Sequence, residues 1–597
     1  MGAASTTASA PKRSYPRQRW VVAPANSQAA ALASAAHLPP VLAELLLARG
    51  IATAQEAHTF LYPDFSHLHD PLAMKGMNVA VERLERAISS GEPILLYGDY
   101  DVDGTTAVVL LKTAIEMLGG TVRFHVPHRI LEGYGLQSSV LEAAYADRVR
   151  LVITVDTGMR AFAEAETARR IGLDLIITDH HLPSADDAVP GALAILNPNQ
   201  PGCLYPEKSL CGAAIAFKLA QALLERRDEA RTREKTLPSF LKMAAIATIA
   251  DAVPLRGESR TIAALGLREL RKPVGSGLRA LFHVAALDPA NKPITGFDVA
   301  FRLAPRINAA GRMDVASEIV ELFCTRDGGR ANELAAKLDL LNRQRRDAEA
   351  AALAIIEARL AEDLEFAAER LLVVHGDGWH RGVIGILASR VVERTAKPAI
   401  VISVEDGVAH GSGRSVDGFP LLEAIETCSD LFTRFGGHAF AVGFAMPADN
   451  VSELRRRLNV HAIERLGGTE AEHVLKIQAE LPLDRITPVL AGWLRRLEPL
   501  GHGNPEPIFV ARRARLISAP RVIKDRHIRL ELAQELVGAA GISGVMRCVG
   551  WDWAGRCTAL ALTAGSLVDV AYRIRENDHP DFGGIEIEIA GLQLADP

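Results

Sequence analysis

The sequence predicts an α/β protein with two α/β regions, a long helix between them and a small β-barrel at its C-terminal end. Residues 76–265 alternate strand-like and helix-like segments, which is typical of βαβ units that build a parallel sheet. No glycine or proline occurs from residue 330 to 363, which indicates one long helix. After residue 467 short alternating segments separated by turn residues follow, as in small barrels.

The N-terminal part divides into two segments. Residues 1–43 contain no aspartate or glutamate but much alanine and serine. We expect residues 1–37 to form a disordered or loosely attached extension, with a transit peptide as the alternative. Periodic leucines at 42, 45, 46 and 47 then predict a helical segment over residues 38–75.

The first α/β domain is expected at residues 76–265. Its strands are expected near 93–98, 121–126, 150–155, 174–178 and 192–196. A helical connector over 266–327 and the long helix over 328–365 follow, and about 30 helical residues would span roughly 45 Å. The second α/β domain is expected at 366–467, with strands near 371–374, 399–402 and 408–411, and the barrel at 468–597.

Composition limits the classes of protein that the chain can represent. The formal net charge of −5 argues against a basic coat over the whole surface, although a local groove can still be positive. Six cysteines occur without CxxC spacing, which argues against a zinc ribbon or a disulfide framework and favours a reduced, cytoplasmic protein. No apolar run reaches the ~18 residues that span a bilayer, so we expect no membrane association.

Acidic and histidine side chains follow several strand-like apolar runs. They are Asp99, Asp101 and Asp103 after residues 94–98, Asp156 after 151–155, Asp179, His180 and His181 after 175–178, and Asp251 after 243–250. Parallel strands that end in such groups bring them into one crevice of the sheet. Five or six oxygen and nitrogen ligands without a thiolate suit Mg²⁺ or Mn²⁺, and the histidine favours Mn²⁺. So many ligands predict a bridged pair of ions, as used in attack of water on phosphorus.

The alternative for each single aspartate is a structural role. An aspartate after a strand is usually a helix N-cap or a turn former. Asp179 has a second alternative, since it can orient His180 or His181 instead of binding a metal. The role of Asp99 is similarly open.

Longer motifs carry a resemblance to a known family. Asp101-Val102-Asp103-Gly104, Asp156, Asp179-His180-His181 and Asp251 resemble, in order and spacing, the four motifs of the DHH phosphoesterases. The segments 97–106, 132–136 and 305–312 look like those of the RecJ family, bacterial exonucleases specific for single strands. The resemblance covers the chain from about residue 38 onward.

The resemblance implies a set of metal ligands. Two Mn²⁺ or Mg²⁺ ions would be held by Asp101, Asp103, Asp156, His180 and Asp251, with Asp156 as the bridge. His181 would contact the scissile phosphate or stabilise developing charge. Many members of the superfamily carry a metal-binding histidine where this chain has Tyr97. We therefore expect Asp99 to be the substitute ligand.

Two glycine-rich clusters in the second α/β region suggest substrate binding. Residues 411–415 combine glycines with Ser412 and Arg414, groups that suit a phosphate, although glycines mark turns as often. Residues 435–438 contain Gly436, Gly437 and His438. Together the clusters resemble the DHHA1 domain, whose GGH motif faces the metal site across a cleft. The expected fold class is thus a DHH and a DHHA1 domain facing a cleft, plus an OB-fold.

Further residues are candidates for contacts with a nucleic-acid strand. Arg129, with Ser412 and Arg414, is expected to form a pocket for a terminal 5′-phosphate. Arg306 and Asn308 are expected to hold backbone phosphates with help from Arg312, and a structural salt bridge is the alternative for both arginines. The C-terminal barrel would bind single strands through basic residues and aromatic stacking. Its candidates are Arg512, Arg513, Arg515, Arg521, Lys524, Arg526, Arg529, Phe509, Trp551, Trp553 and Tyr572, and the tryptophans can equally be core.

These observations predict a metal-dependent exonuclease that degrades single-stranded DNA from 5′ to 3′ into mononucleotides, in DNA repair and recombination. The polarity and the preference for DNA follow from the resemblance alone. The alternatives are a small-substrate phosphodiesterase and a non-enzymatic replication scaffold. The C-terminal barrel argues against the phosphodiesterase, and the complete ligand set argues against the scaffold. We expect a monomer, with single-strand-binding protein and a helicase as candidate partners.

Overall fold

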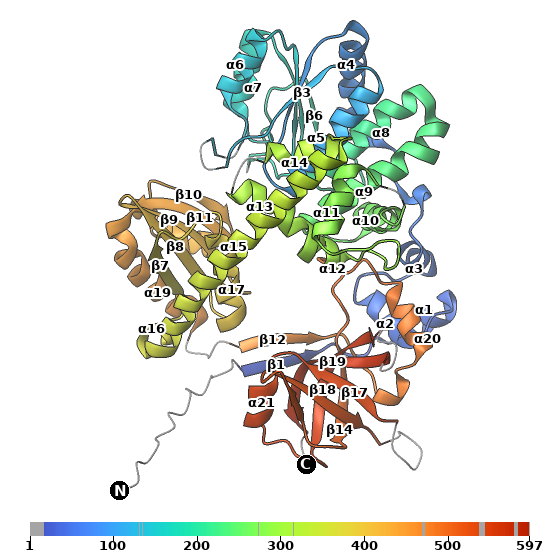
Figure 1. Ribbon diagram of the computed structural model, residues 1–597, viewed down its shortest axis with the longest axis vertical. Coiled ribbons are helices and arrows are strands. Elements are labelled where there is room, and N and C mark those ends of the chain that lie inside the picture. Colours follow the sequence, from blue (N-terminus) through green and yellow to red (C-terminus); the bar gives the residue numbers. More distant parts are fainter. Residues whose placement is uncertain are drawn as a thin grey trace. The chain divides into compact units, whose positions relative to one another are not determined.

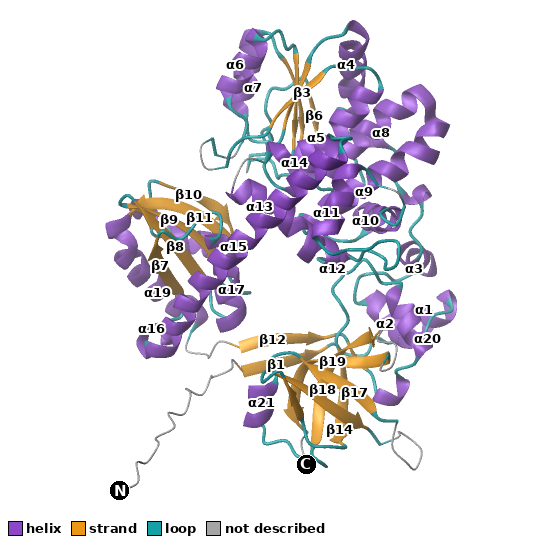
Figure 2. Cartoon of the chain, in the orientation of Figure 1, coloured by secondary structure: helices purple, strands orange, loops and turns teal. Residues whose placement is uncertain are grey.

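The computed structural model describes residues 17–129, 132–133, 135–184, 186–272, 274–313, 316–467, 472–535, 544–577 and 583–595 (Figures 1 and 2). Two compact units divide the chain. The first, called the DHH unit here, comprises residues 27–343 and 492–506. The other, the C-terminal unit, comprises residues 1–26, 344–491 and 507–597. Residues 1–16 of the expected extension and Tyr134 of one motif lie outside the described residues.

The DHH unit contains a five-stranded parallel sheet in the order β3-β2-β4-β5-β6. The strands are β2 (Ile94–Tyr97), β3 (Val122–His125), β4 (Leu151–Val155), β5 (Asp174–Thr178) and β6 (Ala194–Leu196). Each lies where the sequence predicts one. β2 and β4 are buried along their whole length, because helices cover both faces of the sheet.

Alternate residues of the strands face different helix layers. Leu96 and Ile153 pack in a core with α4 (Met77–Ser90), α5 (Val102–Met117), α8 (Gly212–Arg231) and α9 (Leu237–Ala250). Leu95 and Val152 pack on the other face against α6 (Ser138–Ala146) and α7 (Phe162–Ile171), and Figure 1 shows the two layers. The sheet thus lies between helices, with the carboxyl ends of its strands gathered at one edge.

Further helices precede and follow the strands of this sheet along the chain. The N-terminal ones are α1 (Ala29–Ala36), α2 (Pro40–Leu47) and α3 (Ala54–Leu61), with η1 (Phe65–His67), η2 (Pro71–Ala73) and, later, η3 (Thr232–Thr236). The connector contains α10 (Gly257–Glu269), α11 (Ser276–Val284), α12 (Gly296–Asp298), η4 (Val299–Leu303), α13 (Ala304–Met313) and α14 (Ser317–Cys324). The predicted long helix is confirmed as α15 (Gly328–Glu362). The division between the units falls within it.

The second α/β region forms a mixed five-stranded sheet in the order β10-β11-β9-β8-β7. Its elements are α16 (Leu364–Ala368), β7 (Leu372–Asp377), α17 (Ile384–Thr395), β8 (Ala399–Glu405), β9 (Val408–Arg414), α18 (Leu421–Glu426), η5 (Ser429–Leu431), β10 (Arg434–His438), β11 (Ala441–Pro447), η6 (Ala448–Asn450) and α19 (Val451–Leu466). α17 packs with Ile356 and Phe366 on one face, and α18 and α19 pack on the other.

The C-terminal domain is rich in strands, as predicted. Its elements are β12 (Glu472–Ile477), β13 (Ala479–Glu480), η7 (Leu483–Arg485), α20 (Pro488–Arg495), β14 (Phe509–Leu516), β15 (Arg521–Ile523), β16 (His527–Ala533), β17 (Met546–Gly550), α21 (Ala554–Ala559), β18 (Leu567–Asn577) and β19 (Gly584–Leu594). The sheet order is β13-β14-β18-β19-β17-β16-β15. β14 also pairs with β16, but only at Arg515 and Leu516, so the barrel is only partly closed.

The expectation of a disordered extension up to residue 37 is wrong for its second half. Residues 17–22 form β1, which pairs in parallel with β12. Trp20 packs with Leu475 against the apolar core at Ile508, which explains why this strand is held. Residues 29–36 form α1, whose Leu32 is buried.

Among the described helices, none is by itself long and apolar enough to cross a bilayer. α1 and α2 meet the criteria of length and composition only as a pair, which is bent by 112°.

Candidate metal centre and substrate-binding residues

Two carboxylates of the predicted centre lie at the start of α5. Asp101 is the N-cap residue, and its Oδ1 accepts a hydrogen bond from the Gly104 amide at 3.0 Å. Asp103 lies in the first turn of the helix. The backbone amides of Gly212 and Ala213 donate to its two oxygens at 2.6 and 2.8 Å. The first residues of α8 therefore fix Asp103 in place.

Asp156 ends β4 in a left-handed backbone conformation with φ 61°. Its own amide donates to the Thr178 carbonyl on β5 at 2.9 Å. Gly212 leaves room for it, because a Cβ at that position would lie 2.6 Å from the Asp156 Cβ. Sequence reasoning missed Gly212, and the only signal for it is a glycine at the beginning of a predicted helix.

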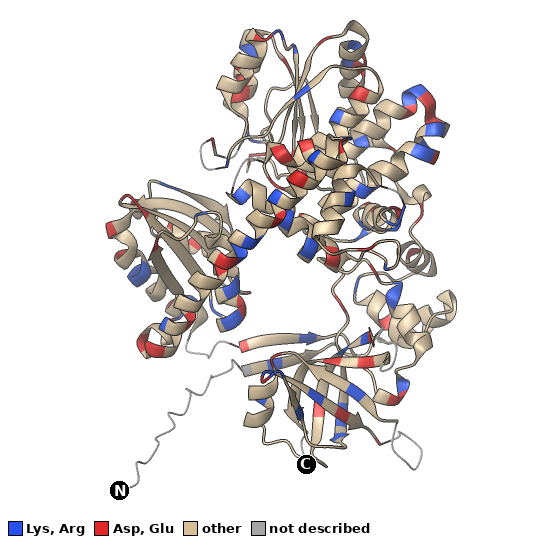
Figure 3. Ribbon diagram, in the orientation of Figure 1, with Lys and Arg blue, Asp and Glu red and all other residues tan. Residues whose placement is uncertain are grey.

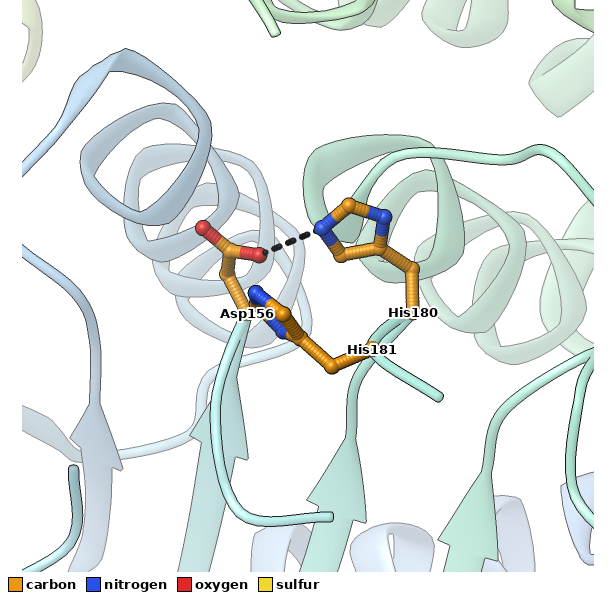
Figure 4. A group of neighbouring side chains, drawn as sticks. All are labelled: Asp156, His180 and His181. Carbon is orange, nitrogen blue, oxygen red and sulfur yellow. Dashed lines mark ion pairs between the residues drawn. The ribbon is translucent and has the colours of Figure 1, made fainter. Parts of the chain in front are cut away.

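The Asp179-His180-His181 segment follows β5, and each of its residues makes different contacts. Figure 4 shows His180 and His181 beside Asp156. Asp179 accepts hydrogen bonds from the amides of Met159, His180 and His181, and its Oδ1 lies 2.7 Å from His181 Nδ1. His180 Nε2 points instead to Asp156 Oδ1 at 3.2 Å, with Asp103 and Asp251 oxygens both at 3.9 Å. The geometry places Asp179 as an orienting residue and His180 among the ligands.

Asp251 reaches the centre from a helix. We expected its apolar run to be strand-like, but residues 237–250 form α9, and Asp251 is the C-cap residue of that helix. A buried helix and a buried strand have similar apolar composition over a short run, which explains this error. The prediction that Asp251 joins the other ligands in space agrees with its place beside His180.

The combined donor set fits divalent cations. Three groups of side chains each bring ligand atoms within 4.8 Å of one another: Asp156 with His180 and His181; Asp103 with His180 and Asp251; and Asp99 with Asp101 and Asp156. Asp99 Oδ1 and Asp156 Oδ1 are buried and accept no well-directed hydrogen bond, although the latter lies near His180. Carboxylate and imidazole donors without a thiolate suit Mn²⁺ or Mg²⁺.

The carboxylates are electrostatically strained in the absence of cations. Burial, then the charge of Asp101, raises the pKa of Asp99 to about 8. Burial and the charges of Asp103 and Asp101 raise the pKa of Asp251 to about 8. Burial and the neighbouring aspartates also raise the pKa of Asp156 well above its usual range. A bound cation relieves this repulsion, which is the physical reason for so many carboxylates in one place.

These shifts predict how Mn²⁺ stabilisation depends on pH. A carboxyl whose pKa is raised on folding binds more protons folded than unfolded, so the stability of the metal-free protein falls as pH rises from about 4 to about 8. Metal binding requires deprotonated ligands, so Mn²⁺ affinity rises over the same window. We expect the gain in Tm on adding Mn²⁺, measured against EDTA, to grow between pH 6 and pH 8. A gain independent of pH would contradict this.

Tyr97 occupies the position of the absent histidine ligand, but its hydroxyl is used in a hydrogen bond outside the metal centre. Its side chain is fully buried, and its hydroxyl donates to the Gly135 carbonyl at 2.8 Å. Its ring lies 5.1 Å from that of His125, which pairs with Glu132. Tyr97 therefore holds the loop that follows β3, while Asp99 lies beside Asp101 and Asp156, as the expectation of a substitute ligand requires.

Residues of α13 contact the segment from Asp99 to Asp103, which is called the metal loop here. Asn308 Oδ1 accepts a hydrogen bond from the Val102 amide at 3.1 Å. Gly311 packs on this loop, since a Cβ there would lie 2.3 Å from the Tyr100 carbonyl oxygen. Arg312 lies on the same helix, half-buried. Arg129 is exposed and lies over the Tyr100 ring at 5.1 Å.

Arg306 is used within the fold. Its Nε lies 3.0 Å from Asp339 Oδ1, and its other nitrogens donate to the carbonyls of Arg302 and Val284 at 2.6 and 3.3 Å. These contacts favour the alternative of a structural salt bridge over phosphate binding. Asn308 likewise supports the metal loop rather than standing free.

Ser412 and Arg414, two of the three residues proposed for the 5′-phosphate, lie on one face of the second sheet together with Gly436 and His438. Ser412 and Gly436 face the same residue, Gly443 on β11, and Arg414 and His438 both face Ala441. Residues directly opposite on antiparallel strands share a face. The two clusters, distant in sequence, are thus aligned across neighbouring strands.

The glycines of these clusters lie in strands β9 and β10 and not in turns, which were the alternative for them. Gly411 makes room for the Phe444 ring, and Gly413 for Leu421 and Val442. Gly437 has φ 146°, and a Cβ there would lie 2.2 Å from the Ala441 carbonyl oxygen. Close packing in the sheet, more than flexibility, accounts for glycine at these positions.

Arg414 and Ser412 flank the first turn of α17. A Cβ on Gly385 would lie 3.2 Å from Ser412 Oγ and 3.3 Å from Arg414 Nη2. Burial lowers the pKa of Arg414. Within the residues that the structure describes, no carboxylate forms an ion pair with Arg414. A half-buried arginine of this kind, beside a hydroxyl and helix amides, suits a phosphate group.

The barrel residues divide into core and surface. Phe509, Trp553 and Tyr572 are buried, which favours a core role, whereas Trp551 is exposed. Arg512 pairs with Glu480 and Asp569, Arg515 with Glu535 and Arg526 with Asp552. Arg521 and Arg529 lie opposite each other on β15 and β16, exposed. Basic and acidic residues are interspersed along the chain in both units, in agreement with the net charge (Figure 3).

Family profiles match three parts of the chain. Residues 93–248 match the N-terminal domain of the DHH family, residues 365–461 match the DHHA1 domain, and residues 477–590 match the RecJ OB domain. These matches confirm the predicted fold class.

Full-length relatives and solved structures extend the similarity. The chain is 34% identical over 572 residues to the single-stranded-DNA-specific exonuclease RecJ of Escherichia coli, covering 93% of this chain and 92% of that protein. It is 36% identical to the protein of the same name from Dickeya dadantii, covering 85% and 89%. The structure of RecJ from Thermus thermophilus in complex with Mn²⁺ superimposes with a TM-score of 0.80 at 29% identity, covering 97% of this chain and 80% of that one. That protein has also been solved with Mg²⁺, and this structure gives a TM-score of 0.75 at 28% identity, covering 97% and 79%.

Proposed function

The chain belongs to the RecJ family of single-stranded-DNA-specific exonucleases, and we propose that it degrades single-stranded DNA from the 5′ end into mononucleotides during DNA repair and recombination. The observation that carries the proposal is the convergence of Asp101, Asp103, Asp156, His180 and Asp251 at the carboxyl edge of one parallel sheet. The 5′-to-3′ direction rests on the family resemblance and on the paired Ser412 and Arg414.

The metal centre supplies the chemistry, and the protein positions it. Two Mn²⁺ or Mg²⁺ ions, when bound, act as Lewis acids toward water and the phosphodiester. Asp101, Asp103, Asp156, His180 and Asp251 would hold them, with Asp156 as the bridge and Asp99 completing the set. Asp179 orients His181 so that its imidazole is available to a phosphate oxygen.

A pocket for the terminal 5′-phosphate is proposed to select strand ends. Arg414, Ser412 and the α17 amides beside Gly385 would bind the phosphate, and Arg129 is proposed as the candidate of the DHH unit for contact with a phosphate of the strand. Gly436, Gly437 and His438 would allow close approach of the strand and donate to its backbone. Asn308 is proposed to support the metal loop and Arg306 to hold α13 against Asp339 of α15. Arg312 is proposed to contact a backbone phosphate of the strand.

We propose the domain boundaries given under Sequence analysis, except that residues 17–37 belong to the folded part of the chain. Single-strand-binding protein and a helicase are proposed partners, because one covers single strands and the other produces them. We propose that the protein acts as a monomer in the cytoplasm, where bacterial DNA is accessible.

The function is tested with a long single strand labelled at its 5′ end and incubated in Mn²⁺. We expect labelled mononucleotide as the first product, and the same strand in blunt duplex form should resist cleavage. Cleavage of a dinucleotide but not of the long strand would instead identify a small-substrate phosphodiesterase. Binding of the strand without any cleavage would identify a scaffold.

The end pocket is tested by Arg414→Ala. A hydrogen-bonded charge contact of about 1.5–3 kcal/mol corresponds to roughly a 10- to 100-fold rise in KM for 5′-phosphorylated strands. KM for strands with a 5′-hydroxyl should change little. Arg456→Ala, on the exposed face of α19 where it pairs with Glu453, is the matched control. Equal effects on both kinds of strand would contradict the pocket.

A further inference from the structure

Two phenylalanine rings are exposed on the helix that leads to the metal loop. Phe297 and Phe301 are 65% and 64% exposed, more than any other described phenylalanine, tyrosine or tryptophan. Their ring centroids lie 4.7 Å apart with an interplanar angle of 34°. α12, η4 and α13 form one continuous helix over residues 296–313, and these two are its only exposed residues. An exposed aromatic pair on an otherwise packed helix requires an explanation.

The rings are held on a rigid support and are not part of a frayed end. The hydroxyl of Thr295 and the carboxylate of Asp298 cap the helix reciprocally. Arg302 pairs with Asp298 and donates to the carbonyls of Ala285 and Ala286 at 2.6 Å each. Five residues between Val299 and Leu303 form a π-helix, a conformation that is frequent at functional sites.

The same helix connects the rings to the metal centre. Its other end contacts the metal loop through Asn308 and Gly311, which touch Val102 and Tyr100. At about 1.5 Å per residue, Phe301 lies roughly 10 Å along the helix from Asn308, and Phe297 roughly 20 Å from Gly311. That distance corresponds to about three to six nucleotides of a stacked strand at 3.4 Å each.

We propose that Phe297 and Phe301 form a base-stacking platform for the single strand, three to six nucleotides on the 3′ side of the scissile phosphate. The proposal rests on the proposed function, because the strand that stacks on the rings is the one that the metal centre cuts. Every base has a π-face, so an aromatic platform holds a strand regardless of its sequence. Rings 4.7 Å apart leave no room for a base between them, so each ring offers its outer face.

Continuity with the metal loop favours DNA over a protein as the occupant. A strand whose 5′ end is at the metal centre must leave it along some surface of the DHH unit. The connector helix contacts the metal loop through Asn308 and Gly311 near its C-terminal end and displays stacking groups within a few nucleotides of that contact. Only 5% of the residues are aromatic, so two neighbouring exposed rings on one helix are unusual in this chain.

The platform is tested with two double variants. Phe297→Leu with Phe301→Leu keeps the surface apolar but removes the rings, and Phe297→Tyr with Phe301→Tyr keeps the rings. 5′-Phosphorylated oligonucleotides carry 2-aminopurine at successive positions, and its fluorescence is quenched on stacking. Binding is measured in EDTA, so that the readout does not depend on catalysis.

We expect quenching in the wild type at one or two positions between the third and sixth nucleotides. The leucine variant should lose this quenching and bind a twelve-nucleotide strand about 10- to 100-fold more weakly, whereas the tyrosine variant should behave as wild type. Unchanged quenching and affinity in the leucine variant would overturn the proposal and leave the rings as a protein-docking surface. Cleavage of a trinucleotide in Mn²⁺ should be equal in all three proteins. Failure of the wild type to cleave the long labelled strand would overturn the proposed function separately.

Discussion

Asp156→Asn is expected to abolish nuclease activity while it stabilises the metal-free protein. The side chain belongs to two of the three groups that could hold an ion, and its loss would remove several kcal/mol of charge stabilisation, or about 10³-fold or more in kcat. The same carboxylate is strained by burial and by its neighbours. Its neutral replacement should raise the stability of the metal-free fold by on the order of 1 kcal/mol.

The opposite signs of these two effects separate a metal ligand from a structural residue. Activity on a labelled strand and Tm in EDTA and in Mn²⁺ are measured for wild type and variant. Asp147→Asn is the matched control, because Asp147 forms only an exposed pair with Arg123, and it should change neither quantity much. A variant that is destabilised in EDTA, or still stabilised by Mn²⁺ as the wild type is, would argue against the metal assignment.

The parallel sheet and its metal edge could be predicted because local sequence carries both signals. Strands β2, β4 and β5 are short apolar runs bounded by turn residues, and each ends directly in an acidic group. Their order in the sheet brings these groups together without any further information. Asp156 and His180 were found in this way.

The residues that sequence reasoning misjudged depend on contacts between distant segments. Gly212 is needed only because Asp156 and Asp103 approach the start of α8. Arg306 is taken up by Asp339, which lies on another helix, so its basic character alone suggested a phosphate. Gly411 and Gly413 were interpreted as part of a phosphate site or as turn residues, because no local sequence signal indicates that Phe444 and Leu421 pack against them. Tertiary packing decided each of these cases.

His181→Gln is expected to lower kcat by about 10²–10³-fold and to leave Mn²⁺ affinity nearly unchanged, because His181 is turned toward Asp179 and not into the densest part of the ligand set. Although burial alone would lower it, the hydrogen bond and charge of Asp179 raise the pKa of His181 to about 9. The imidazole is therefore held as a cation that can stabilise negative charge on a phosphate oxygen.

Asp179→Asn distinguishes this electrostatic role from simple positioning. The asparagine keeps one oxygen, which can replace Oδ1 as the acceptor for the backbone amides of His180 and His181. It loses the Oδ2 acceptor of the Met159 amide and the charge that holds the proton on His181. The pKa of His181 should then fall toward its ordinary value of about 6.5. A group that must be protonated is lost as pH rises through its pKa, so activity of the variant should fall between pH 6 and pH 8 relative to wild type. Bound cations lower the pKa of His181 in both proteins, and the difference between the two profiles is the quantity measured. Parallel profiles, together with equal loss at every pH, would mean that Asp179 only orients the ring.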